Sequence, residues 1–163
     1  MIVTFREKIA RALTSDAQLQ AELRGMQPAD WEPLADLFAA RLPEFDAVYA
    51  VPGAEMLAAQ VARIRGVPDY TASGFPTGSG EVALFSVHLQ AAERARQAVE
   101  AAQNAGWRVL VLGTAVERTN KGGRALLAAL GVQVRAATQV ADTPSGLVFE
   151  RRTPDRWTTQ AAE

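Results

Sequence analysis

A polar segment with two glycines follows the most apolar stretch of the chain. It consists of Thr119, Asn120, Lys121, Gly122 and Gly123. The next residues have the period of a helix, and glycines at a helix start let backbone N–H groups approach an anion. The lysine adds charge and the polar side chains add hydrogen bonds. The segment predicts either a phosphate-binding loop or a plain strand-to-helix turn with a solvated lysine, and it lacks Walker A spacing.

A second turn of this kind follows Val51. It consists of Pro52, Gly53, Ala54 and Glu55, and a helical pattern begins at its end. Gly53 suits a close backbone approach to a ligand, whereas the carboxylate of Glu55 favours the helix dipole but repels an anion. A capped turn and a ligand contact both remain open here.

Other side chains have two interpretations each. Glu117 is the one carboxylate between residues 113 and 123, so it is either a solvent-facing glutamate or a catalytic group. His88 is expected to be a half-buried histidine whose hydrogen bonds are satisfied. The alternative is a catalytic histidine. Tyr70, Phe75 and Trp157 are expected to pack, with stacking on a base as the alternative.

Composition excludes several classes of protein. The chain of 163 residues has no cysteine and one histidine, which excludes disulfide scaffolds, thiolate nucleophiles, iron–sulfur clusters and multi-histidine metal sites. Its 17 basic and 18 acidic residues are spread along the sequence, so no nucleic-acid footprint is expected. No apolar run is long enough for a membrane span and no signal-peptide pattern opens the chain, so a cytoplasmic protein is expected.

The hydrophobic period places these residues on an alternating series of elements. Helices are predicted within 1–41 and at 54–65, 91–105 and 124–130, and strands at 45–51, 67–70, 81–89, 108–112 and 132–140, with 147–150 pairing back. The pattern indicates one domain: a helical segment (1–43), a core (44–150) and a polar tail (151–163). It predicts a three-layer α/β fold with a mostly parallel central sheet.

Ligands of such sheets bind outside the carboxyl ends of the strands. The two turns described above therefore come to the same edge of the sheet. In this prediction the strand from Arg108 ends at Leu112, and a loop covers Gly113–Gly123. The glycine-rich stretch 71–81 is either a mobile lid over the pocket or a disordered connection.

The two units together resemble the type I phosphoribosyltransferases, particularly the adenine and orotate types. Residues 45–58 (FDAVYAVPGAEMLA) resemble the first strand of that family, its pyrophosphate loop and the helix behind it. Residues 108–112 (RVLVL) and 119–131 (TNKGGRALLAALG) resemble its signature strand, phosphate loop and following helix. The resemblance covers residues 44–150 and implies that fold, a homodimer, and Mg²⁺ as a cofactor if the protein is active.

The sequence departs from the family where the ribose is held. The signature strand of the family ends in two adjacent acidic residues that bind the ribose hydroxyls of phosphoribosyl pyrophosphate, and here these positions are Gly113 and Thr114. Losing two charge-assisted hydrogen bonds weakens the anchoring by about 3 kcal/mol or more. The basic residue that follows the second strand of the family is also missing from 67–71.

The sequence thus predicts a divergent phosphoribosyltransferase-like protein that binds a phosphorylated ligand, a nucleotide or phosphoribosyl pyrophosphate, with reduced or lost transferase activity. Two alternatives remain. One is an active nucleobase phosphoribosyltransferase of purine or pyrimidine salvage, and the other is a non-enzymatic interaction protein with an empty pocket.

Overall fold

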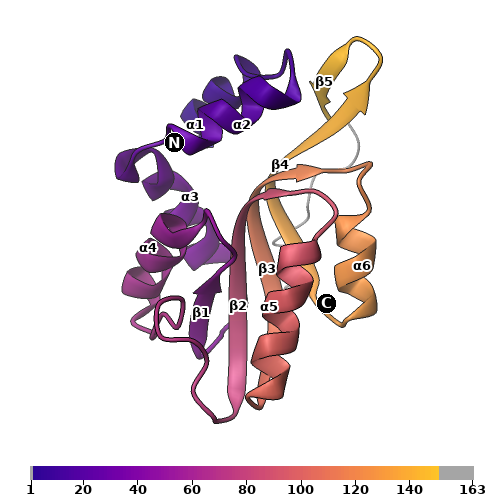
Figure 1. Cartoon of the computed structure of the whole chain (residues 1–163). Helices are drawn as coiled ribbons and strands as arrows, with labels where there is room; N and C mark the ends of the chain where they lie inside the picture. Colours follow the sequence, from indigo (N-terminus) through magenta and orange to yellow (C-terminus); the bar gives the residue numbers. More distant parts are fainter. Residues whose placement is uncertain (1, 151–163) are drawn as a thin grey trace.

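A five-stranded sheet in the order β1-β2-β3-β4-β5 forms the centre of the protein (Figure 1). The computed structural model describes residues 2–150. The strands are β1 (Ala47–Ala50), β2 (Gly80–Leu89), β3 (Trp107–Arg118), β4 (Gln133–Thr143) and β5 (Gly146–Phe149). The first four run parallel, and β5 turns back antiparallel to β4.

Helices cover both faces of this sheet, which confirms the predicted three-layer α/β fold (Figure 1). They are α1 (Ile2–Ala10), α2 (Asp16–Arg24), α3 (Pro28–Arg41), α4 (Glu55–Arg65), α5 (Glu93–Asn104) and α6 (Gly123–Ala129). The pair α3 and α4 packs on one face, and α5 and α6 pack on the other. Helix α2 lies across the carboxyl ends of β1 and β2.

Two apolar cores hold these layers together. Phe38 of α3 meets Phe85 of β2 edge to face on one side of the sheet, with ring centroids 5.7 Å apart. On the other side, Leu84 and Leu112 pack with Val99 of α5. Strands of a parallel sheet that are covered on both faces are apolar throughout, which is why these segments were recognisable in the sequence.

One predicted boundary is wrong, and it changes the site. The strand expected to end at Leu112 continues to Arg118, so Gly113 and Thr114 lie within β3 and not in a loop. The extension is paired on both sides, since Thr114 is in register with Ser86 of β2 and Ala136 of β4. The expected strand at 67–70 is reduced to one bridge, between Val48 and Asp69.

The glycine-rich stretch is packed rather than disordered. The ring of Phe75 stacks on Tyr49 of β1 with centroids 4.6 Å apart. The indole N–H of Trp107 donates to the Pro76 carbonyl at 2.8 Å, at the amino end of β3. Residues 71–79 therefore form a fixed connection on the α5 side of the sheet, and Phe75 is a packing residue, as expected.

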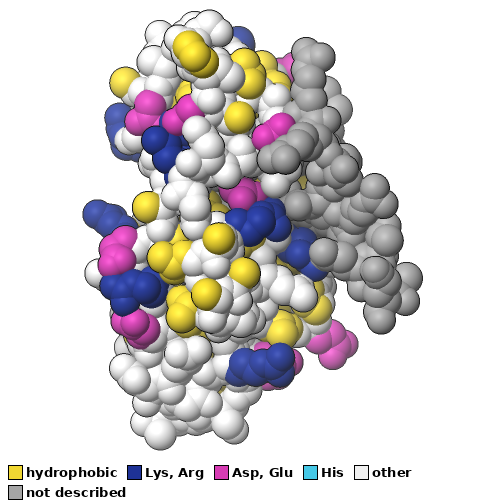
Figure 2. Space-filling model, turned by 90° about the vertical axis from the view of Figure 1, so that its right-hand side faces the viewer, with side chains coloured by type: hydrophobic (Ala, Val, Ile, Leu, Met, Phe, Trp, Pro, Cys, Tyr) yellow, Lys and Arg dark blue, Asp and Glu magenta, His cyan; other side chains and the backbone are white. Residues whose placement is uncertain are grey.

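Outside the grey atoms of Figure 2, basic and acidic side chains alternate on the visible face and do not gather by sign. Within residues 2–150, no helix is long and apolar enough to cross a membrane. The tail 151–163, with Trp157, lies outside the described residues.

Candidate functional site

A cleft of about 740 Å³ opens at the carboxyl ends of β1 and β2. Helix α2 forms one wall, and the first turn of α5 forms another. The lining residues are Gln20, Leu23, Arg24, Val51, Pro52, Gly53, Ser86, Val87, His88, Leu89, Gln90, Ala91, Ala92, Glu93, Arg94 and Ala95. Small-molecule sites have volumes of roughly 300–1,000 Å³, so the cleft has the size and the place expected of a ligand site.

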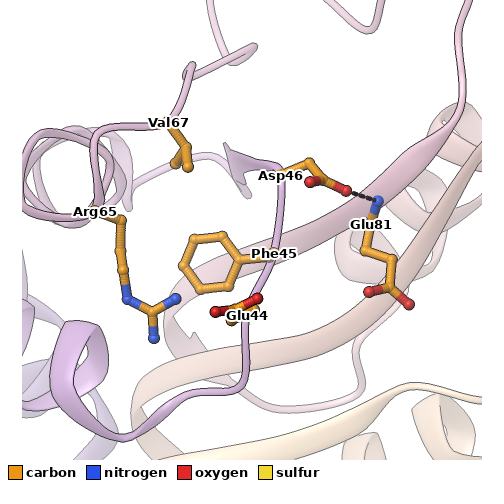
Figure 3. A pocket seen from close by; sticks show the side chains of 6 residues that line it. All are labelled: Glu44, Phe45, Asp46, Arg65, Val67 and Glu81. Carbon is orange, nitrogen blue, oxygen red and sulfur yellow. Dashed lines mark hydrogen bonds between the residues drawn. The ribbon is translucent and has the colours of Figure 1, made fainter.

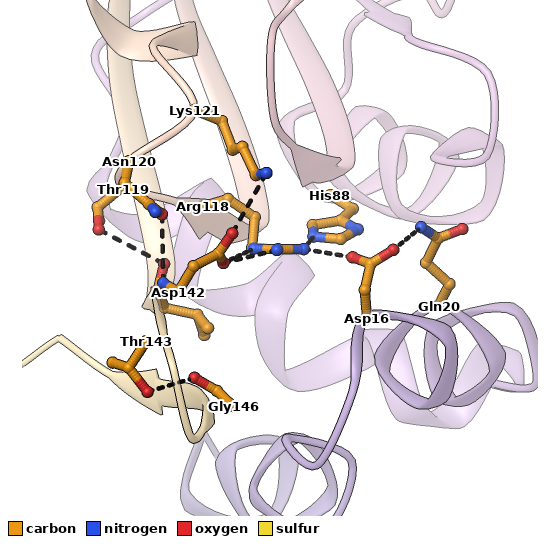
Figure 4. A network of polar contacts seen from close by, with 11 residues as sticks. Asp16, Gln20, His88, Arg118, Thr119, Asn120, Lys121, Asp142, Thr143 and Gly146 are labelled. Atoms are coloured by element: carbon orange, nitrogen blue, oxygen red, sulfur yellow. Dashed lines mark hydrogen bonds and ion pairs between the residues drawn. The ribbon is translucent and has the colours of Figure 1, made fainter.

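A network of charged groups closes the edge of the sheet beside this cleft (Figure 4). Arg118, at the end of β3, is 4% exposed and pairs with Asp16 at the start of α2. Its other side contacts Asp142 of β4 at 2.6 Å. Lys121 reaches the second oxygen of Asp142 at 3.2 Å. The two aspartates thus neutralise two cations at this edge and fasten α2 to the sheet.

The network controls the ionisation of its members. Burial raises the pKa of Asp16 and of Asp142, but the hydrogen bonds and charge of Arg118 outweigh it, so both stay below their usual value. Burial lowers the pKa of Arg118, and the two aspartates more than reverse this. All three groups therefore remain charged at neutral pH.

His88 lies between this network and the cleft. Its Nε2 atom is 3.4 Å from a guanidinium nitrogen of Arg118. Burial first, and the charge of Arg118 second, lower the pKa of His88 to about 4. The imidazole is therefore neutral at pH 7 and offers the cleft a hydrogen-bonding group without charge.

This pKa predicts a loss of stability in mild acid. An unfolded histidine titrates near pH 6.5, and folded His88 near 4, so between these values the unfolded state binds more protons. The contribution is fully present above about pH 6.5 and is lost as the pH falls to about 4. Between pH 7.0 and pH 4.5, the free energy of unfolding measured in urea is expected to fall further in the wild type than in His88→Gln. Equal drops would contradict the low pKa.

The predicted phosphate segment is an ordered turn between β3 and α6. The Thr119 N–H donates to the Val140 carbonyl at 3.0 Å, and Asn120 Oδ1 accepts the N–H of Asp142 at 3.2 Å. Gly122 has φ +85°. A Cβ at Gly123 would lie 2.3 Å from the Gln90 carbonyl, so glycine there permits close contact with the end of β2. The turn thus adjoins the cleft through Gln90, but its own residues do not line it.

The turn after β1 does line the cleft. Pro52 and Gly53 are on its wall, and Gly53 has φ +104°, where glycine is favoured. The Glu55 carboxylate accepts the Gly53 N–H at 3.0 Å, while Ala54 is buried at the start of α4. Of the two predicted loops, the structure brings this one to the cleft together with His88.

The two positions that the resemblance assigns to ribose binding are buried. Gly113 lies against the rings of Phe38 and Phe85, and a Cβ there would be 3.0 Å and 3.1 Å from them. Thr114 is fully buried, and its Oγ1 accepts a hydrogen bond from Ser86 at 2.8 Å. Neither position presents a side chain to the edge of the sheet.

Glu117 is not the solvent-facing glutamate that the sequence suggested. It is 3% exposed because β3 continues past it. Both of its oxygens accept from Arg124 of α6, at 2.7 and 3.0 Å, and Gln139 of β4 donates at 3.0 Å. Its carboxylate therefore anchors α6 to the sheet.

A smaller cavity of about 240 Å³ lies at the opposite, amino edge of the sheet (Figure 3). Its Asp46 accepts the N–H of Glu81 at 2.9 Å, and Arg65 donates at 2.7 Å to the Ala39 carbonyl at the end of α3. These polar groups tie strands and helices together. We therefore assign this cavity to the packing of the edge and not to a ligand site.

The side chains at the carboxyl edge do not fit a magnesium site. Mg²⁺ requires oxygen ligands, and Asp16, Asp142 and Glu117 already pair with arginine. Among residues 2–150, no group of three or more histidine or acidic side chains is arranged to hold a metal ion.

Sequence reasoning missed much of this edge. The sequence predicts a loop at Arg118, and no local pattern connects Asp16 to it. Nothing local marks Arg24 or Arg94 as cleft residues, because two separate helices bring them there. A buried strand that ends in a charged pair, as β3 does at Glu117 and Arg118, is the one signal available in the sequence.

Comparisons with known proteins show where this geometry occurs. No protein-family model matches the sequence, and no curated protein matches it. Solved structures do match. Orotate phosphoribosyltransferase from Aeropyrum pernix is 19% identical with a TM-score of 0.66, covering 85% of this chain and 94% of that one. Adenine phosphoribosyltransferase from Thermoanaerobacter pseudethanolicus is 13% identical with a TM-score of 0.65, covering 82% and 98%.

A longer protein shares the same architecture in part. UMP synthase from Leishmania donovani is 22% identical with a TM-score of 0.59, and the match covers 69% of this chain but 27% of that one. At these identities the likeness concerns the fold. The protein has the type I phosphoribosyltransferase-like α/β fold, as the sequence resemblance implied.

Proposed function

We propose that this protein binds a small phosphorylated molecule at the carboxyl edge of its sheet and does not transfer a phosphoribosyl group. The observation that carries the proposal is the cleft of about 740 Å³, which lies where ligands of parallel α/β sheets bind. The solved phosphoribosyltransferases with this fold bear names that state transfer to orotate or adenine. We therefore expect the ligand to be a nucleotide or phosphoribosyl pyrophosphate.

The loss of transfer follows from the ribose-side positions. Transfer through an oxocarbenium-like state needs the ribose to be held in place, and catalysis is mainly positioning and charge stabilisation. Gly113 and Thr114 supply no carboxylate and are enclosed within β3. The end of β3 carries Glu117 and Arg118 in place of an acidic pair, and Glu117 is already bound by Arg124. The missing charge-assisted hydrogen bonds correspond to a rate loss of about a hundredfold or more.

The family resemblance assigns the phosphate groups to the two turns of this edge. Pro52 and Gly53 line the cleft, and the turn Thr119–Gly123 adjoins it at Gln90. Lys121 would have to exchange Asp142 for a ligand phosphate. Glu117, engaged by Arg124, takes no part in catalysis in this proposal.

A thermal-shift screen tests binding. The probes are phosphoribosyl pyrophosphate, the nucleoside 5′-monophosphates and inorganic phosphate, each with and without Mg²⁺. A ligand at 100 times its Kd that binds the native state alone adds about 2.7 kcal/mol, which raises Tm by several degrees. A shift with at least one organic phosphate is expected. No shift with any probe would overturn the proposal and favour an interaction protein.

A turnover assay tests the second half of the proposal. Pyrophosphate release from phosphoribosyl pyrophosphate is measured with Mg²⁺ and each nucleobase, including orotate. We expect no release above the protein-free rate. Release at an enzymatic rate would show an active phosphoribosyltransferase instead.

Two further expectations belong to this proposal. They are a homodimer and a cytoplasmic location, and both rest on the resemblance and on the sequence. Sedimentation equilibrium is expected to give twice the monomer mass, and a single-chain mass would contradict the dimer.

A further inference from the structure

The two arginines that line the cleft come from two different helices. Arg24 belongs to the last turn of α2, and Arg94 to the first turn of α5, and both line the cavity. Within the described part of the chain, neither guanidinium has a hydrogen-bond or ion-pair partner. Lys121 and Arg118, by contrast, are already paired with aspartates.

We propose that Arg24 and Arg94 hold the anionic group of the ligand between them, so that the anion is bound by the two helices and not by the turn at Lys121. This inference rests on the proposed function, since it says where in the cleft the charged group of that ligand lies. The ligand chemistry is an oxyanion, a phosphomonoester or a carboxylate, attached to a largely apolar body.

The charge of the cleft wall favours an anion. Glu93 is the one carboxylate among the lining residues, and Arg96 of the next helical turn binds it. His88 is neutral at pH 7 because its pKa is about 4. Arg24 and Arg94 therefore leave two positive charges on the cleft that no lining group compensates.

The position of Arg94 also favours an anion. A cation in the first turn of a helix is repelled by the positive end of the helix dipole. An anion between the two arginines removes this repulsion and receives the paired hydrogen bonds that guanidinium groups give to phosphate and carboxylate.

The rest of the wall suits an apolar body. Leu23, Val51 and Leu89 are buried and line the same cavity. Gln20 and Gln90 also line it, and the amide of Gln20 donates to Asp16 at 2.7 Å. A molecule held in this way connects α2 of the helical segment to α5 of the core, so its binding stabilises the attachment of α2.

The experiment measures the affinity of full-length variants for defined probes. Adenosine 5′-monophosphate and phenyl phosphate are titrated by calorimetry at pH 7.5, and benzoate separates a carboxylate from a phosphate on the same ring. Arg24→Ala and Arg94→Ala are each expected to weaken binding of the best probe at least tenfold, and the double variant further. Both side chains are exposed, so their unliganded Tm values are expected to stay within about 2 °C of the wild type.

Two other variants decide between sites. Arg63→Ala removes an exposed arginine of α4 that does not line the cleft, and it is expected to leave the affinity unchanged. Lys121→Ala is expected to have a smaller effect than either cleft arginine. If Lys121→Ala abolishes binding while the cleft variants bind normally, the inference is wrong and the proposed function stands. If the wild type binds no probe, the inference is wrong, and the thermal-shift screen decides the proposed function separately.

Discussion

Gly113→Glu is expected to abolish folding rather than to restore a ribose-binding carboxylate. A Cβ at this position would lie 3.0 Å from Phe38 and 3.1 Å from Phe85, in the centre of one core. Overpacking of this kind costs about 1–3 kcal/mol, and an unpaired buried carboxylate costs several kcal/mol more. The sum approaches the whole stability of a typical domain, about 5–15 kcal/mol.

Urea unfolding and the yield of soluble protein measure this effect. Gly113→Ala, which adds the Cβ alone, is expected to lose about 1–3 kcal/mol. Gly25→Ala is the control, because a Cβ there meets only two backbone oxygens, at an ordinary 3.4 Å and 3.7 Å. A folded Gly113→Glu protein with near wild-type stability would show that β3 does not bury this position, and the account of the lost ribose contact would fail.

Arg118→Met is expected to lower the free energy of unfolding by about 3 kcal/mol at pH 7. Arg118 is buried, and its removal leaves Asp16 and Asp142 without their main partner. Breaking a buried ion pair by removing one member costs roughly 3–5 kcal/mol, and the partial exposure of both aspartates favours the lower end of that range. The substitution is also expected to weaken the attachment of α2 to the sheet.

The contribution of Arg118 to stability is expected to depend on pH. Arg118 keeps the pKa of both aspartates below their usual value, so its contribution is present above about pH 4 and is lost as the pH falls through their folded pKa. The difference between wild type and variant should therefore shrink in acid. Arg108→Met, which breaks an exposed pair with Glu81, is expected to cost about 0–1 kcal/mol. Equal costs for the two variants would contradict the structural role of Arg118.

The sequence predicted the layers of the fold because burial imposes simple patterns. Residues 47–51 and 109–112 are apolar on both faces, as strands beneath two helical layers must be. Gly66 ends α4 in the left-handed conformation that favours glycine, at φ +69°, directly after the predicted helix 54–65.

The same local rules failed at β3. A glycine and a threonine after an apolar run indicate the end of a strand, but Gly113 is needed where Phe38 and Phe85 leave no space for a side chain. Strand pairing with β2 and β4 on both sides then carries β3 on to Arg118. Tertiary contact overrode local propensity, and this moved Glu117 from the expected surface into the core.

The candidate site was predictable only in outline. The rule that ligands bind at the carboxyl ends of parallel strands draws attention to the turn after β1, and Gly53 of this turn lines the cleft. Arg118 and Asp16 are 102 residues apart in the sequence, and no spacing rule connects them. Arg24 and Arg94 likewise meet at one cavity only because α2 crosses the end of β2.

The most direct test of the account is a titration followed by two-dimensional ¹H–¹⁵N NMR. Labelled full-length protein is titrated with phosphoribosyl pyrophosphate and with each nucleoside 5′-monophosphate. The account predicts saturable shifts of amides around the cleft, above all Gly53, His88 and Arg94, with the amide of Gly78 at the opposite edge unchanged. Shifts centred away from the carboxyl edge, or no saturable shift with any of these phosphates, would contradict the claim that this fold binds a phosphorylated ligand there.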